Sequence, residues 1–538
     1  MRKIIKQIMC LILVTTLLIS SNAIALNIKN NNKNIIEKKY DIENKNGFFS
    51  SLDIDYKIVF TVKEIRAFDK IDLFNDPDFY VVIYVNDDRY QSPCWNNQKY
   101  VIEDWSTDPI DVPDDDNEIK IKIQLWDKNI GKDKLCDISD NEDYGAGNNQ
   151  YDVDLIYDLK SGHWRGDDEI YPLYYSNRDY SGYGRLNGCD DNSIYENDRD
   201  CELIFDITQN DPDGDGIPYW TEINEFGTDP EVNDSGLDTD NDNVPIEWEF
   251  KWGHYFGYDW KNETYISLWY YDPFITEDHA NIDFDYDGLQ NTEEYLTSQW
   301  GSDPYRQDIF LELDQMELGP DGEGAFVPDL SKEFMKDPFR KHNIVLHIDD
   351  GCMGGGQVNV SFAPSTNHTE LIQIYKDYFL HNDPNNWRRG TFHYAIVVYN
   401  STDHPGFAFR TSVNDINRLD SFLIESLTQD VRPVYKTPIR NILMRKSLDP
   451  QYHRVVGYAS AMMHETGHVL GIFRSNTPGC DNKYSVIPNK EWLKFRCYKS
   501  CMNYNYIYYL IDYSDGSRGK NDFDDWQKID LTLFEKDL

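Results

Sequence analysis

Three short acidic segments in the middle of the chain share one spacing, which strongly constrains how that part can fold. Each segment carries aspartates at its first, third and fifth positions and a glutamate at its twelfth. The residues are Asp211, Asp213, Asp215 and Glu222; Asp238, Asp240, Asp242 and Glu249; and Asp283, Asp285, Asp287 and Glu294. Alternating carboxylates at this spacing can wrap around one divalent cation, and the last glutamate can bind it through both oxygens. We therefore expect this region to fold around calcium ions.

The residues between the carboxylates fit the same arrangement. Gly216 and Gly288 occupy the sixth position of the first and third segments, where the loop must turn sharply. The close spacing, with Gly-Thr-Asp-Pro at 227–230 and Gly-Ser-Asp-Pro at 301–304, resembles thrombospondin type 3 repeats over residues 207–304. The resemblance implies a calcium-stiffened spacer between domains. The alternative is a set of solvated acidic turns that hold no ion.

The charge of the chain agrees with bound divalent cations. Its 538 residues carry 95 Asp and Glu against 52 Lys and Arg, a formal net charge of −43 at pH 7. Such a surface repels phosphate, so we expect no nucleic-acid partner. Without their ions the clustered carboxylates also repel one another, and the repeat segment should loosen.

The N-terminus has the composition of an export signal. Basic residues precede an apolar run at 8–19 that is short for a membrane span, and a small-x-small pattern for a signal peptidase follows at 23–25. We expect residues 1–25 to be cleaved and residues 26–50 to form a disordered leader. The mature protein is then secreted or associated with the cell surface. An uncleaved anchor is the alternative.

Eight cysteines follow this signal, in two groups of four on either side of the acidic middle. An even number in an exported protein predicts disulfides, whose pairing the sequence leaves open. The groups are Cys94, Cys136, Cys189 and Cys201, and Cys352, Cys480, Cys497 and Cys501.

Short segments rich in β-formers begin at residue 56. YKIVFTV, DFYVVIYV and EIKIKIQLWD are separated by turn-rich acidic stretches, which is typical of an antiparallel β-sandwich over residues 51–206. DPDFYVVIYV and IQLWDKNIGKDKLCDIS resemble two regions of C2-like domains. The resemblance implies calcium ligands at Asp72, Asp78, Asp127 and Asp133. Lys128-Asn129 departs from the usual second aspartate, and ordinary acidic loops are the alternative. A further alternative for the whole chain is a sandwich that contacts a membrane or surface glycan while the peptidase acts on neighbouring proteins.

Strand and helix patterns alternate from residue 308 onward. DIFLELDQM, NIVLHIDDG and FHYAIVVYN are patterned as strands, and DLSKEFMKDPFRKH as an amphipathic helix. This order predicts an α/β domain over residues 305–538, with a twisted sheet and a helix behind it.

One predicted helix, RVVGYASAMMHETGHVLGI, carries the residues with the clearest chemistry. His464 and His468 lie one turn apart on one face, where both imidazoles can bind one zinc ion. Glu465 lies beside them and can act as general base on a water molecule. The alternative is two histidines on a helix surface with no metal.

A second motif follows downstream, at Ser500-Cys501-Met502-Asn503-Tyr504. This motif resembles the Met-turn of metzincin zinc peptidases. With HETGH in the same order, the chain from residue 308 onward resembles that family. It implies that Met502 packs beneath the histidines. It also implies that Tyr504 lies near the metal or the oxyanion of the reaction.

The third zinc ligand departs from the metzincin pattern. HExxHxxGxxH places a histidine, or sometimes an aspartate, where this chain has Arg474, whose guanidinium is always protonated and cannot bind zinc. We favour Asp481 as the replacement, because Cys480 is more simply explained as a disulfide partner. Glu491 would instead resemble gluzincin peptidases, against which the Met-turn argues.

These features predict a multidomain chain with an N-terminal antiparallel β-sandwich, a calcium-loop repeat segment and a C-terminal zincin-like α/β domain. The expected function is a secreted, calcium-stabilised zinc endopeptidase that hydrolyses proteins or peptides. The rival is a calcium-dependent cell-surface or adhesion protein whose peptidase domain has lost its metal at Arg474. The zinc content of the purified protein distinguishes the two.

Overall fold

The computed structural model describes residues 55–533 apart from short internal segments. Those outside the description are 69, 73–74, 114–117, 140–150, 160, 167–181, 189–198, 260, 262–263, 357–359, 403–405, 409–420, 432–449 and 483–488. The predicted signal at 1–25, the predicted leader at 26–50 and Cys189 also lie outside the described residues. No helix of the described part is long and apolar enough to cross a membrane.

The chain divides into two compact units. The first takes in the described residues of 1–169, 183–235 and 256–266, and the second those of 170–182, 236–255 and 267–538. The predicted repeat segment, 207–304, is thus shared between them, with its first acidic loop in the first unit.

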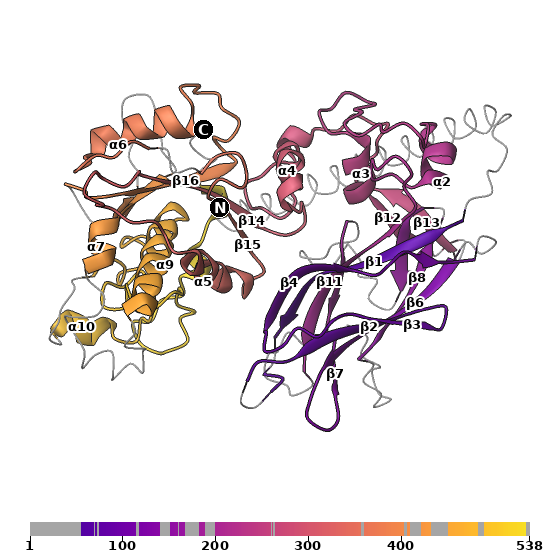
Figure 1. Ribbon diagram of the computed structural model, residues 1–538, viewed down its shortest axis with the longest axis horizontal. Helices are drawn as coiled ribbons and strands as arrows, with labels where there is room; N and C mark the ends of the chain where they lie inside the picture. Colours follow the sequence, from indigo (N-terminus) through magenta and orange to yellow (C-terminus); the bar gives the residue numbers. More distant parts are fainter. Residues whose placement is uncertain are drawn as a thin grey trace, which may run out of the picture. The chain divides into compact units, whose positions relative to one another are not determined.

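The first unit is built on two antiparallel sheets (Figure 1). One has the order β10-β11-β1-β4, with β5 beside β1: β1 (Lys57–Ala67), β4 (Tyr100–Ser106), β5 (Ile110–Asp111), β10 (Gly184–Asn187) and β11 (Cys201–Gln209). The other has the order β3-β2-β6-β8-β9, with β7 beside β6: β2 (Phe79–Val85), β3 (Asp88–Gln91), β6 (Glu118–Asp127), β7 (Lys134–Cys136), β8 (Val153–Asp158) and β9 (His163–Gly166).

Both sheets contribute to one hydrophobic core. Every second residue of β6 is buried, as the alternation of its sequence predicts. These residues pack in one cluster with Phe60 of β1 and Phe205 of β11, whose rings stack 5.1 Å apart. The predicted antiparallel β-sandwich is confirmed.

Residues 219–300 form short helices and one two-stranded sheet, in chain order with the acidic loops. They are α2 (Tyr219–Thr221), η1 (Glu222–Phe226), α3 (Ile246–Gly253), β12 (His254–Asp259), β13 (Thr264–Trp269), η2 (His279–Asn281), α4 (Asn291–Thr297) and η3 (Ser298–Trp300).

The second unit contains a five-stranded sheet of order β15-β14-β16-β18-β17, in which β17 alone is antiparallel to its neighbour. Its strands are β14 (Asp308–Gln315), β15 (Val345–Asp349), β16 (Phe392–Val398), β17 (Gly406–Ala408) and β18 (Ser421–Glu425). The helices with it are α5 (Asp329–Arg340), α6 (His368–Ile374), η4 (Tyr375–Phe379), α7 (Ser426–Val431), α9 (Pro450–Val469), α10 (Lys490–Phe495), η5 (Trp526–Lys528) and η6 (Leu531–Leu533).

Helices cover both faces of this sheet. Alternate residues of β14 point to opposite sides: Leu311 packs in a cluster with Met335 of α5 and Met462 of α9, and Phe310 packs in another with Phe379 of η4. Figure 1 shows α6 on one side of the sheet and α5 and α9 on the other. The predicted strands, the predicted helix at α5 and the histidine-bearing helix at α9 are confirmed. All eight residues of β14 are buried, and its apolar residues at 309–311 supply both cores.

The predicted disulfides are absent for six of the described cysteines. These free thiols are Cys94, Cys136, Cys352, Cys480, Cys497 and Cys501. Cys136, Cys480 and Cys501 are buried in the two main cores, where a thiol packs as a small hydrophobic group. The prediction from an even count and an export signal is therefore wrong for these six residues.

Candidate zinc centre and calcium loops

Helix α9 holds both histidines in fixed orientations. Nδ1 of His464 lies 2.9 Å from the carbonyl oxygen of Cys501, and Nδ1 of His468 lies 2.8 Å from that of Ile472. A carbonyl only accepts hydrogen bonds, so Nδ1 carries the hydrogen in each ring and Nε2 of the neutral imidazole keeps its lone pair. Each ring therefore presents its Nε2 as a metal-binding atom, in the way that outer hydrogen bonds orient histidine ligands.

Asp481 meets both of these nitrogens. Its Oδ1 lies 3.3 Å from Nε2 of His464 and 3.4 Å from Nε2 of His468. The ligand atoms of a tetrahedral zinc ion with bonds of about 2.0 to 2.1 Å lie about 3.3 Å apart. The three donors repel one another unless a proton or a cation lies between them. Their identity and spacing fit zinc.

The loop that carries Asp481 is held by Arg474. The guanidinium donates to the carbonyl oxygen of Asp481 at 3.4 Å and pairs with Glu491 of α10 at 3.5 Å. Glu491 is thus engaged by Arg474. Cys480 is buried, with its Sγ within 4.8 Å of the ligand atoms of His468 and Asp481, and burial raises the pKa of its thiol. Of the three candidates from the sequence, Asp481 is the one brought against both histidines.

The segment Cys501-Met502 contacts both Asp481 and His464 through its backbone carbonyls. The carbonyl oxygen of Met502 accepts the backbone N–H of Asp481 at 3.1 Å, and the neighbouring carbonyl of Cys501 holds His464. Met502 is fully buried against α9, where a Cβ built on Gly467 would lie 2.5 Å from its Sδ. A side chain at this position of HETGH would force Met502 to shift, a close approach that the sequence does not signal.

Tyr504 and Glu465 flank the histidines. The ring of Tyr504 stacks on that of His464 with 5.5 Å between centroids, and burial, helped by the charges of Asp481 and Glu465, raises the pKa of its hydroxyl. Glu465 lies beside the strand β17, where a Cβ built on Gly406 would be 2.6 Å from its Oε1. Among the described strands β17 is the last of its sheet, and an edge strand has backbone groups on its outer side that can pair with another chain.

The three acidic loops share one backbone geometry. In the first, Asp211 accepts backbone N–H groups from Gly214 and Gly216, each at 2.7 Å. The corresponding distances are 2.7 and 3.0 Å in the second loop and 2.7 and 3.1 Å in the third. The fourth and sixth positions have positive φ throughout, and the second loop uses Asn241 and Asn243 there. Asparagine tolerates this conformation, so the missing glycine leaves the turn unchanged.

Several carboxylate oxygens in these loops lack donors. At least one oxygen of every third-position aspartate and every twelfth-position glutamate is buried without a hydrogen-bond partner in the described part of the chain: Asp213, Asp240 and Asp285, and Glu222, Glu249 and Glu294. Burial, with the neighbouring carboxylates adding to it, raises the pKa of Glu222 to about 8 and that of Asp240 to about 6. Buried carboxylates without donors are stable when a cation neutralises them, and oxygen ligands suit calcium.

Each loop also receives an acidic residue that sequence reasoning missed. The backbone N–H groups of Asp234, Glu277 and Asp308 donate to the fifth-position aspartates Asp215, Asp242 and Asp287, at 3.3, 3.1 and 2.7 Å respectively. All three residues end the same pattern, Asp-Pro followed by three residues and an acid. That recurrence was the available signal. In the second repeat the strands β12 and β13 separate the pattern from its loop, which hides it in the sequence.

The four aspartates predicted as calcium ligands of the sandwich have protein donors. Nζ of Lys134 lies 2.6 Å from Asp72 and 3.3 Å from Asp127. Asp78 accepts the backbone N–H of Asn97 at 2.7 Å, and Asp133 accepts the hydroxyl of Tyr80 at 2.8 Å. A lysine ammonium therefore supplies positive charge between Asp72 and Asp127, where the resemblance to C2-like domains implied calcium.

Comparison with known proteins finds likeness in solved structures alone: no family model and no curated protein matches the chain. A structure described as that of a C2 domain is 10% identical with a TM-score of 0.16, covering 28% of this chain and 98% of that one. A C2 domain of plant extended synaptotagmin 1 is 10% identical with a TM-score of 0.16, covering 29% and 95%. Human group IVD cytosolic phospholipase A2, in complex with methyl gamma-linolenyl fluorophosphonate, is 11% identical with a TM-score of 0.17, and the match spans 17% of its chain. TM-scores this low carry no argument about function.

Proposed function

We propose that this protein is an exported zinc endopeptidase with calcium bound in its first and third acidic loops. The observation that carries the proposal is the approach of Asp481 to the Nε2 atoms of His464 and His468, at 3.3 and 3.4 Å. Two imidazoles and one carboxylate are a donor set of catalytic zinc sites, which keep a further position open for water or substrate.

The residues around these donors fit peptide hydrolysis. Zinc held by them would supply the Lewis acidity that polarises a water molecule and a peptide carbonyl. Glu465 accepts the proton of that water and returns it to the leaving amine. Tyr504 keeps its proton because burial raises its pKa, so its hydroxyl can donate a hydrogen bond to the oxygen that gains charge.

The strand β17 can bind a substrate in an extended conformation. A peptide can add to the open edge of a sheet through main-chain hydrogen bonds, and the edge strand β17 lies beside Glu465. Recognition through the main chain needs no free terminus on the substrate, which favours an endopeptidase.

The test is Glu465→Gln in the full chain, compared with Glu333→Gln on the surface of α5. We expect Glu465→Gln to lower kcat on an unfolded, fluorescently labelled protein by about 10²-fold or more, with zinc content unchanged. Glu333→Gln should match the wild type. Hydrolysis that survives in Glu465→Gln would sink the mechanism. Wild-type protein that binds calcium and no zinc would favour the adhesion protein.

For calcium we propose the first and third loops, which have carboxylates at positions one, three, five and twelve and a glycine at position six. Calcium offsets the charge of buried oxygens that lack donors in the described structure. Calorimetric titration of chelator-treated protein with calcium measures the number and affinity of the calcium sites. Absence of binding would contradict the proposal.

For the sandwich we propose a C2-like contact with a membrane or surface glycan that does not use calcium at Asp127. Lys134 already lies between Asp72 and Asp127. Binding to anionic liposomes and to polysaccharide, with and without calcium, tests this. Binding that requires calcium and is lost in Asp127→Asn would contradict it.

A further inference from the structure

The second acidic loop differs from the other two around its twelfth-position glutamate. In the first loop Glu222 accepts the hydroxyl of Thr228 at 3.1 Å, and in the third Glu294 accepts that of Ser302. Both hydroxyls belong to the residue before an Asp-Pro pair, and the equivalent residue in the second repeat is Tyr271. Glu249 is fully buried, and neither of its oxygens has a hydrogen-bond partner among the described residues.

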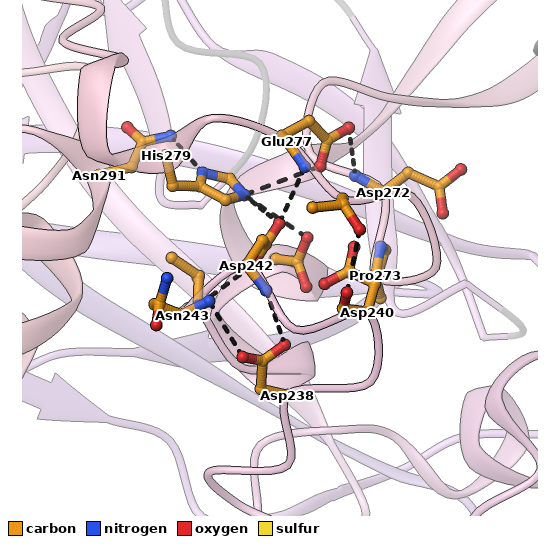
Figure 2. Close-up of polar contacts among 12 residues, drawn as sticks. Asp238, Asp240, Asp242, Asn243, Asp272, Pro273, Glu277, His279 and Asn291 are labelled. Atoms are coloured by element: carbon orange, nitrogen blue, oxygen red, sulfur yellow. Dashed lines mark hydrogen bonds and ion pairs between the residues drawn. The ribbon is translucent and has the colours of Figure 1, made fainter.

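A histidine takes the place of that hydroxyl. Nε2 of His279 lies 3.2 Å from Oδ2 of Asp242, 3.7 Å from Oε1 of Glu249 and 3.7 Å from Oε2 of Glu277. Figure 2 shows the imidazole directed at Asp242 and Glu277. His279 follows Glu277 by two residues, and the equivalent positions in the first and third repeats are Gly236 and Phe310, which offer no ligand atom.

The surroundings fix the ring of His279. Nδ2 of Asn291 lies 2.9 Å from its Nδ1, and turning that amide end for end presents Oδ1 there to accept an Nδ1–H. With the amide so turned, Nε2 has a free lone pair directed at the carboxylates. The rings of Trp248 and Tyr271 meet the imidazole edge to face at 6.0 and 5.2 Å, and His279 is fully buried. These contacts keep the nitrogen in place and water away.

We propose that Asp242, Glu249, Glu277 and His279 bind a divalent ion of the zinc class instead of calcium. One ligand atom from each of the four lies within 4.8 Å of the others. Calcium takes oxygen ligands, whereas an imidazole nitrogen suits zinc and its neighbours among the transition metals. A dication offsets two of the three carboxylate charges, and an imidazolium would offset one. The chain then has a second zinc site, structural and distant in sequence from HETGH.

The test uses the His464→Ala variant, which lacks a ligand of the proposed peptidase centre. Zinc bound by this variant can then be assigned to the second site. Full-length protein is stripped with chelator, saturated with calcium and titrated with zinc by calorimetry. We expect about one zinc ion per chain in His464→Ala. Adding His279→Asn should weaken that binding by about 100-fold or more.

A matched control is His342→Asn, which changes an exposed histidine stacked on Trp526. It should leave the zinc titration of His464→Ala unchanged. A zinc-edge anomalous map of His464→Ala crystals should show the ion beside Nε2 of His279, and this readout holds even where His279→Asn fails to fold. Equal zinc binding with and without His279, or no peak at that nitrogen, would overturn the proposal. Absence of zinc at His464 and His468 of the wild type would contradict the proposed peptidase and leave the proposed site at His279 standing.

Discussion

The guanidinium of Arg474 donates a hydrogen bond to the backbone carbonyl of Asp481, 3.4 Å away. Arg474 occupies the position where the metzincin pattern has its third ligand. It contacts the main chain of the residue whose carboxylate approaches both histidines. The arginine that made the motif look incomplete therefore holds the loop that brings Asp481 into the site.

We predict that Asp481→Asn weakens zinc binding by about 100-fold or more, because it removes a charged ligand. Arg474→Ala should weaken it by less than about tenfold, since the arginine side chain is 61% exposed and such contacts contribute about 0–1 kcal/mol. Competition with a fluorescent chelator measures both affinities. The reverse order of effects would show that Asp481 is not the ligand.

Gly467→Ala should destabilise the second unit by about 1–3 kcal/mol, the usual range for overpacking. The added Cβ would lie 2.5 Å from Sδ of Met502 and 3.0 Å from Cε1 of Tyr513. Urea denaturation followed by tryptophan fluorescence gives the free energy of unfolding. The double variant with Met502→Ala should lose less free energy of unfolding than the sum of the two single losses. A loss equal to that sum would contradict the contact.

Chelated protein should lose stability as pH rises from about 4.5 to about 8. Burial raises the pKa of Glu222 from 4.5 to about 8, so the folded state holds a proton there that the unfolded state has released. The free energy of unfolding therefore falls with pH in this window. Denaturation of the chelated protein at a series of pH values measures the slope, which Glu222→Gln should reduce. Saturating calcium should flatten it, and equal slopes with and without calcium would count against a calcium site.

Arg388→Met should cost about 3–5 kcal/mol of stability, because it leaves two buried carboxylates without their partner. The guanidinium lies 2.5 Å from Glu312 and 2.6 Å from Asp349, and all three side chains are buried. The control is the adjacent Arg389→Met, which should cost less than about 1 kcal/mol. Similar losses in both variants would refute a special role for the buried ion pairs.

The third acidic loop offers a matched pair of substitutions. Gly288 and Tyr286 have φ of 96° and 62°, and L side chains in this region cost about 1–2 kcal/mol. Gly288→Ala should therefore weaken calcium binding, and Tyr286→Gly, at a residue 74% exposed, should leave it equal or stronger. Calcium titration by calorimetry compares them. Equal affinities in the two variants would mean that the backbone conformation is unimportant.

The sequence by itself determined the elements whose pattern is local. Alternation along β6, the apolar residues at 309–311 of β14 and the one-turn spacing of His464 and His468 each follow from the geometry of a single strand or helix. The acidic loops were equally readable, because their spacing lies within twelve residues.

Only the tertiary structure decided which distant side chains meet. It brought Asp481, of the three candidates, against both histidines, with its backbone N–H held by Met502. It also added Glu277 and His279 to a loop that ends at Glu249. It also placed Lys134 among the sandwich aspartates and left six of the described cysteines as free thiols. These outcomes depend on the packing of segments that are far apart in the chain. A short-range sequence pattern does not encode which of several similar side chains such packing brings into contact.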